Sequence, residues 1–474
     1  MTLKKTRILA VCALAVTSLL ASQIWAADTA KPTWIGVDVG KVGLAGSFAE
    51  KDGVFTVNGA GGGIYIAGDS FHYVHVPLEG DGAITVRVVA MKNSVANTTL
   101  GLMARETLEY DSKHVYLFLR PNRGYLAACQ ARIGDDIESV QTVAKAEGVK
   151  LPCWLRMTRQ GDKFETFLSQ DGKEWKPFGE VTNTLSRYVH LGMIVCSHRT
   201  NLLTEGVFDH VTVSGVMPPA ERFRAEVAKT LNRLWGEKPR DPRLAAFDAL
   251  ATKRRDERAG LAFPKRKKLI SANVHPMPPP AEFKARLKEY EQRPYDGVLF
   301  TLKGGQRPFQ RRPWDEARFV EDYEALADLQ SRVLTDNFIV VHTSATVDWF
   351  DDKQWESVLR NTRMLAKAAL LGRCAGFFVD PEGYGANAWS YFDAIGHEEK
   401  PFEQFHAQVR KRGETWIQAI QQELPSPRLL FAFLMPTTQL IHDPDLPVER
   451  IQKDIPAMRY ALLPSFVNGV LKGA

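Results

Sequence analysis

The sequence predicts two folded parts in series: an antiparallel β-sandwich over residues 34–215 and an α/β domain of parallel strands over residues 265–474. A helical linker over residues 216–264 is expected to join them. Three observations predict this. Short runs of alternating apolar and polar residues, separated by Gly, Asp and Asn, fill the first part. Strand-like runs alternate with amphipathic helices in the second. The linker is rich in Arg, Lys, Glu and Ala.

The first 26 residues have the organisation of a secretory signal peptide. Lys4, Lys5 and Arg7 give a basic start, and the apolar run 8–20 is too short to span a bilayer. Cleavage is expected after Ala26. No later stretch is apolar enough to cross a membrane, so we expect a periplasmic or secreted chain with no membrane partner after cleavage.

The charge balance argues against a nucleic-acid partner. The chain has 61 Lys and Arg against 55 Asp and Glu. Removing the three basic residues of the signal peptide leaves it close to neutral. A nucleic-acid binder would concentrate positive charge on one face.

Four cysteines follow the signal peptide, namely Cys129, Cys153, Cys196 and Cys374. Their spacings match no zinc pattern. We expect buried free thiols, and the exported location leaves open one disulfide among the first three.

The sandwich region carries a recognisable series of segments. They are Phe71-His72-Tyr73, Gly80-Asp81-Gly82, residues 101–106, Trp154-Leu155-Arg156 and residues 169–172. In this order they resemble the concanavalin A-like jelly-roll domain appended to β-xylosidases and to many exported carbohydrate-active proteins. The resemblance covers nearly all of residues 34–215 and implies a β-sandwich fold. This architecture hosts many roles, so it is less specific about function.

A sugar-binding face on this domain would use aromatic rings to stack on sugars and charged groups to bond hydroxyls. The residues expected there are Arg105, Glu106, His72 and Trp175. The alternative is that Trp154 and Trp175 are core residues and that Arg105 and Glu106 form a structural pair.

The alternation of strand-like and helix-like runs in the second part predicts consecutive β/α units. Expected strands are 269–275, 296–302, 338–342, 375–380, 429–434 and 462–467, and expected helices are 280–292, 315–332, 351–371 and 402–424. A TIM-type barrel is the predicted fold. A closed barrel needs about eight units, and six are present, so we expect either a truncated barrel, which we prefer, or an open sheet.

The fourth strand ends in two carboxylates. Asp380 and Glu382 are two residues apart, so both can project into the mouth of a barrel, where catalytic groups of this fold gather. A neighbouring carboxylate raises a pKa, as a general acid requires. The segment is similar to the Asp-x-Glu ending of the fourth strand in glycoside hydrolases of the chitinase clan, although the longer acidic run before it is absent. The resemblance implies that Glu382 is the proton donor and that Asp380 orients it and shifts its pKa. The alternative is an exposed turn.

Other polar and aromatic residues are expected around this mouth, at strand ends and in adjoining loops. As substrate-binding residues we predict Asn273, His275, Lys303, His342, Trp349, Tyr384 and Trp389. Aromatic rings beside carboxylates suit a carbohydrate site.

The leading hypothesis is therefore an exported, glycoside hydrolase-like protein without a cofactor, acting on a polysaccharide or oligosaccharide. One alternative is a metal-dependent barrel hydrolase with His275, His342, Asp380 and Glu382 as ligands, although no close pair of histidines supports it. A second alternative is a non-catalytic glycan-binding or surface protein.

Overall fold

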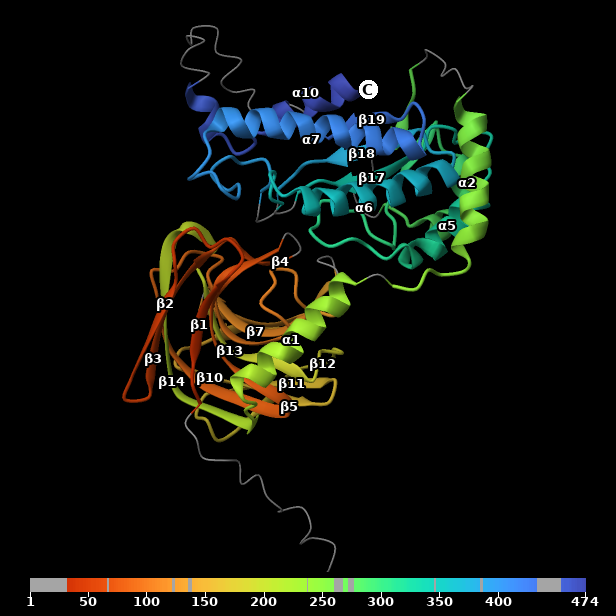
Figure 1. Ribbon diagram of the computed structural model, residues 1–474. Coiled ribbons are helices and arrows are strands. Elements are labelled where there is room, and N and C mark those ends of the chain that lie inside the picture. The colour runs from red at the N-terminus through yellow and green to blue at the C-terminus, as the bar shows by residue number, and fades with distance from the viewer. Residues whose placement is uncertain are drawn as a thin grey trace, which may run out of the picture.

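The computed structural model describes residues 32–65, 68–121, 124–134, 139–236, 238–259, 267–271, 277–344, 347–383, 387–432 and 453–474. It has a β-rich part built from the first half of the chain and an α/β part built from the second (Figure 1). The predicted signal peptide, residues 1–26, lies outside the described residues.

The β-rich part is one large antiparallel, sandwich-like sheet of fourteen strands. They are β1 (Ile35–Val39), β2 (Ser47–Lys51), β3 (Val54–Gly61), β4 (Gly63–Tyr65), β5 (Gly68–Lys92), β6 (Thr99–Arg105), β7 (His114–Pro121), β8 (Tyr125–Arg132), β9 (Val140–Val149), β10 (Cys153–Gln160), β11 (Lys163–Ser169), β12 (Lys176–Thr182), β13 (Tyr188–Cys196) and β14 (Arg199–Val216). The main hydrogen-bonded path runs β12-β11-β10-β5-β13-β6-β7-β8-β9, with β14 pairing to β3 and β5.

Alternation along each strand explains why these residues form a two-faced sheet. In β10, Cys153, Leu155 and Met157 are buried, whereas Trp154 and Arg156 are half-buried on the opposite face. The long strand β5 pairs with β1 and β13 at one end and with β10 and β14 at the other. It therefore links the two sides of the fold, and the inward-facing residues form the large core of this part.

Two helices follow the strands. Helix α1 (Ala220–Trp235) packs on β13 and places Phe223 edge-on to the ring of His190, with 4.8 Å between ring centroids. Helix α2 (Leu244–Ala259) packs instead on helices of the α/β part. The predicted helical linker is thus divided between the two parts.

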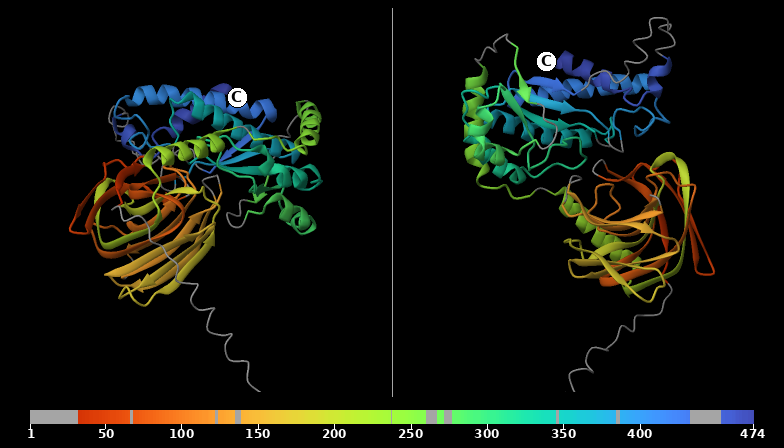
Figure 2. Two further views of the ribbon diagram at one scale, coloured as in Figure 1. Left: turned by 60° about the horizontal axis from the view of Figure 1, so that its bottom comes forward. Right: turned by 180° about the vertical axis from the view of Figure 1, so that it is seen from behind.

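The α/β part contains five parallel strands in chain order: β15 (Ile270–Ser271), β16 (Gly297–Phe300), β17 (Phe338–His342), β18 (Gly376–Asp380) and β19 (Arg428–Phe431). Its helices are α3 (Pro280–Ala285), α4 (Leu287–Glu291), η1 (Glu316–Phe319), α5 (Val320–Ala327), α6 (Asp352–Leu371), α7 (Phe402–Glu423), η2 (Ile455–Ala457) and α10 (Leu463–Gly473). Figure 2 shows α2 at one end of this part and α7 lying along it.

Alternate residues of these strands point to opposite faces of the sheet and pack into two different hydrophobic clusters. Ile339 and Val341 of β17, with Phe377 and Val379 of β18, join the large core that the helices complete. Val340 and its neighbours on the opposite face form a small cluster. The helices are therefore packed against one face of the parallel sheet.

The expected barrel is not shown. Over the described residues the five strands form an open sheet with β15 and β19 at its edges. The predicted sixth strand, 462–467, was wrong, because this segment lies in helix α10. Leu463, Phe466 and Val470 recur at helical spacing and are buried on one face, and Pro464 is tolerated in the first helical turn.

Ion pairs join the two parts of the molecule. The guanidinium of Arg312 donates through Nε to Oδ2 of Asp111 at 2.7 Å, and both side chains are buried. Arg311 pairs with Glu109 and lies over the ring of Tyr110, 4.3 Å from its centroid. Leaving a buried charge without its partner is costly, so these contacts hold the β-rich part against the loop that follows β16.

The four cysteines are buried free thiols. Burial raises the pKa of Cys129 and Cys153 to about 11 and that of Cys196 and Cys374 to about 12, which makes them poor nucleophiles. Among the described residues, the helices are all too short or too polar to span a bilayer.

Candidate functional site

The candidate site lies where β17 and β18 end. The two strands are parallel and in register, so His342 and Asp380, the last residues of each, lie side by side. Nδ1 of His342 is 3.0 Å from Oδ2 of Asp380, and both side chains are mostly buried. Parallel pairing thus brings together two of the residues that the sequence placed at strand ends.

The carboxylate of Asp380 is held as an anion. Burial alone would raise its pKa. The close contact with His342, the N–H of Glu382 at 3.0 Å and the positive charge of Arg307 outweigh burial, so the pKa lies below its ordinary value. Positive and donating groups therefore dominate the surroundings of Asp380.

Glu382 follows in a short loop that other segments hold in place. Its side chain is half-buried. The next residue, Gly383, donates its N–H to Oη of Tyr460 at 3.2 Å and accepts a hydrogen bond from Arg459. The segment before α10 therefore fixes the loop that carries Glu382. Tyr384 lies outside the described residues.

Arg307 is a site residue that the sequence analysis missed. It lies in the loop after β16, is buried, and donates from Nη1 to Oγ of Ser344 at 3.0 Å. The preceding residue, Gln306, accepts the backbone N–H of His342 through its carbonyl at 2.8 Å. A Gly-rich stretch directly after a strand was the only signal that this loop would cross the end of the sheet.

Two of the predicted substrate-binding residues are core residues instead. Trp349 and Trp389 are fully buried and lie in an aromatic cluster with Phe309, Trp355 and Phe466. Nε1 of Trp349 donates to the carbonyl of Ala388 at 3.0 Å. Loop position alone suggested a surface role, but these rings fill the space between α6, α7 and α10.

The other predicted substrate-binding residues are Lys303, Asn273 and His275. Lys303 points outward, is 56% exposed and pairs with Glu321 at 3.4 Å. Asn273 and His275 lie outside the described residues. In the part of the chain that the structure describes, no three His, Cys, Asp or Glu side chains are grouped as metal ligands would be.

Three of the four predicted sugar-binding residues of the sandwich are buried. Arg105 donates to Oδ2 of Asp69 at 3.1 Å, and Nδ1 of His72 lies 2.7 Å from Oδ1 of Asp38. Oε1 of Glu106 accepts the N–H of Ser186 at 2.8 Å. These three side chains contact other polar groups inside the protein and do not form an exposed face. The alternation of β6 did not reveal this, because all seven of its residues are buried.

The fourth predicted residue, Trp175, belongs to a partly exposed aromatic face. Trp154 and Trp175 meet edge to face with centroids 6.4 Å apart, and the guanidinium of Arg156 lies 3.8 Å from the centroid of Trp175. His210 flanks Trp154 at 5.0 Å. All of these side chains lie at least partly on the surface, on the outer side of β10.

Comparisons with known proteins give partial structural likenesses. No protein-family model matches the chain, and no curated protein matches it. A protein of unknown function from Saccharomyces cerevisiae is 15% identical, with 40% of this chain and 97% of that chain covered and a TM-score of 0.32. The GH43 protein BlXynB from Bacillus licheniformis is 13% identical over 36% of this chain and 35% of that one, with a TM-score of 0.29. An alginate lyase from Klebsiella pneumoniae is 10% identical over 37% and 85%, with a TM-score of 0.26.

Proposed function

We propose that the protein is an exported carbohydrate-active protein that cleaves glycosidic bonds at the end of β17 and β18. The observation that carries this is the pair of carboxyl groups at one strand end, of which Asp380 is held as an anion by His342 and Arg307. A second, half-buried carboxyl group, that of Glu382, follows two residues later. One ionised and one separately placed carboxyl group are what glycoside hydrolysis uses.

The two carboxyl groups would have different roles. Glu382 would transfer its proton to the glycosidic oxygen as the bond between that oxygen and the sugar carbon breaks. The oxygen of a water molecule would then bond to that carbon, and a proton of the water would return to the Glu382 carboxylate. Asp380 accepts the backbone N–H of Glu382 at 3.0 Å, so it positions the residue that carries the acid. Its negative charge also favours the positive charge that develops on the sugar ring in the transition state.

Glu382→Gln is expected to lower the rate of glycan cleavage by about 100-fold, because glutamine keeps the shape but cannot donate a proton as an acid. The measurement is release of reducing ends from a panel of xylan, cellulose, chitin, pectin and alginate. The matched control is Glu147→Gln, an exposed residue of β9, which should keep full activity. Activity within twofold of wild type in a folded Glu382→Gln variant would contradict the proposal.

A second candidate function is glycan binding by the sandwich, and the face around Trp175 favours it. Flat aromatic rings pack against the apolar faces of sugars, and Arg156 holds the Trp175 ring in place. This function requires no catalysis by Glu382.

Trp175→Ala is expected to weaken retention of the full chain on an insoluble polysaccharide by about tenfold, corresponding to about 1.4 kcal/mol of lost stacking. Depletion from solution by xylan, cellulose or chitin measures it. Phe392→Ala, which removes an exposed ring from the α/β part, is the control and should bind as wild type does. Equal retention of the two variants would remove this candidate.

A further inference from the structure

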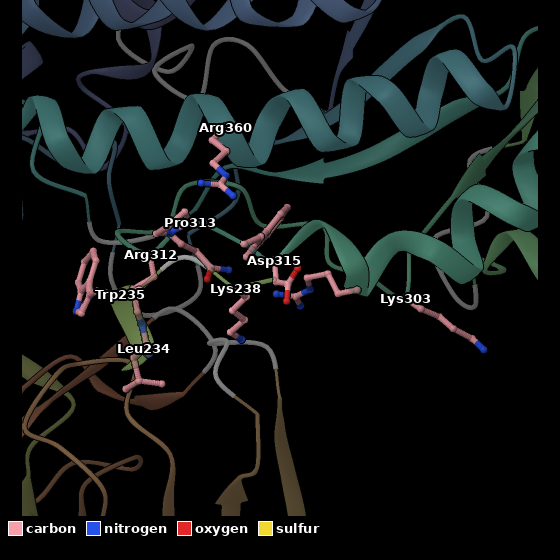
Figure 3. A pocket seen from close by; sticks show the side chains of 12 residues that line it. Leu234, Trp235, Lys238, Lys303, Arg312, Pro313, Asp315 and Arg360 are labelled. Carbon is pink, nitrogen blue, oxygen red and sulfur yellow. The ribbon is translucent and has the colours of Figure 1, made fainter. Parts of the chain in front are cut away.

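A cavity lies away from the Asp380 carboxylate, between the end of α1 and the loop that follows β16. Its volume is ≈ 420 Å³, which suits one or two sugar residues. Leu234 and Trp235 of α1, the segment 310–318 and Arg360 of α6 form its walls (Figure 3). The structural and sequence features described above assign it no role.

The walls of this cavity are strongly basic. Among the residues that the structure describes, Lys238, Lys303, Arg312, Arg318 and Arg360 line it, together with the carboxylate of Asp315. Asp111 offsets Arg312 and Glu321 offsets Lys303, and Lys303 points away at the rim (Figure 3). The side chain of Asp315 accepts the N–H of Ala317 and caps helix η1. Over the described residues, the five basic side chains outnumber the carboxylates of Asp315, Asp111 and Glu321, and this balance favours an anion.

Arg360 is the cation best placed to take a ligand charge. It is exposed on α6, and among the residues that the structure describes it has no hydrogen-bond or ion-pair partner. In Figure 3 its guanidinium points from α6 towards Pro313, into the space that the cavity occupies. A planar guanidinium can bind a carboxylate or sulfate through two parallel hydrogen bonds.

A buried indole in the same wall also lacks a partner. Trp314 is 4% exposed, and within the described part of the chain its Nε1–H makes no hydrogen bond. Arg318 lies over its ring, 5.1 Å from the centroid, which fixes the indole plane. The indole therefore shapes the wall, and the contacts to a ligand come from the basic side chains around it.

We propose that this cavity binds a sugar residue that bears an anionic group, either the carboxylate of a uronate or a sulfate ester. Arg360 and Lys238 line the space for the anionic group, and the half-buried ring of Trp235 offers an apolar surface for the sugar face. The identification of the ligand as a sugar rests on the proposed function. The preference for an anion rests on the charges of the wall alone.

The test measures binding of oligogalacturonate, a sulfated galactan oligosaccharide and a neutral xylo-oligosaccharide to the full chain by titration calorimetry. Arg360→Glu is expected to weaken binding of the anionic oligosaccharides at least tenfold. Arg410→Glu, which makes the same charge change at an exposed position of α7, should weaken it less than twofold. The two anionic probes separate the carboxylate source from the sulfate source.

The Glu382→Gln variant keeps this test independent of catalysis, because it should bind the anionic oligosaccharides as wild type does. Loss of cleavage in that variant with no binding of any anionic probe would overturn the cavity proposal and leave the proposed function standing. Equal weakening by Arg360→Glu and Arg410→Glu would also overturn it, since binding would then follow net charge. Competition by inorganic sulfate at the same concentration as the sulfated sugar would exclude a sugar ligand.

Discussion

Asp69→Asn is expected to lower the free energy of unfolding of the β-rich part by about 3–5 kcal/mol, because it leaves buried charges unpaired. Asp69 is 2% exposed and lies among Arg132, Arg105 and His114. Its Oδ1 accepts from Nη2 of Arg132 at 2.8 Å. Burial would raise the pKa of this carboxyl group, but the surrounding positive charges outweigh burial and lower it. An amide cannot balance two buried guanidinium groups.

Urea unfolding followed by tryptophan fluorescence measures this change. Glu205→Gln is the control, because it breaks the exposed pair with Lys92, and exposed pairs contribute only about 0–1 kcal/mol. If the free energy of unfolding of Asp69→Asn lies within about 1 kcal/mol of the wild-type value, the carboxylate is not needed to balance the charges of Arg105 and Arg132.

Acidification from pH 8 to pH 5 is expected to cost about 2 kcal/mol of stability for each of His75 and His198. Burial lowers the pKa of both residues to about 4, from an ordinary value of 6.5. Below pH 6.5 the unfolded chain binds protons that the folded chain does not. The stabilisation is therefore complete above pH 6.5 and is lost as the pH falls towards 4.

His198→Asn tests this directly. His198 has a left-handed backbone with φ 56°, which asparagine tolerates better than most residues. The variant should lose about 2 kcal/mol less than wild type between pH 8 and pH 5. His210→Asn is matched to it, because His210 also has positive φ, at 49°, but is 56% exposed. An unchanged loss in His198→Asn would show that another group controls the acid sensitivity.

The sequence predicted the strands of the α/β part well where apolar residues run without a break. Phe338–His342 was predicted with the bounds of β17, and Asp380 was correctly placed at the end of β18. The prediction of a strand at 462–467 failed because a short, mostly apolar run fits a buried strand and a helical face equally well. The segment forms helix α10, which packs against α7.

The candidate site was predicted less completely. Register between parallel strands brings His342 to Asp380, and strand ends are visible in the sequence. The burial of Trp349 and Arg105 depends on which segments cover them, and alternation along one strand does not contain that information. Arg307 approaches the site through a loop, whose path follows from packing and not from periodicity.

The buried pair of Arg312 and Asp111 has a consequence for the evolution of this chain. A domain that is exchanged freely between proteins has a surface that needs no specific contact with the adjoining domain. Here each half supplies one charge of a pair that neither can bury alone. Recombination that replaced one half would leave Asp111 or Arg312 buried without its partner. The segments around these two residues should therefore be inherited together, and a change of charge at one position should be accompanied by the opposite change at the other.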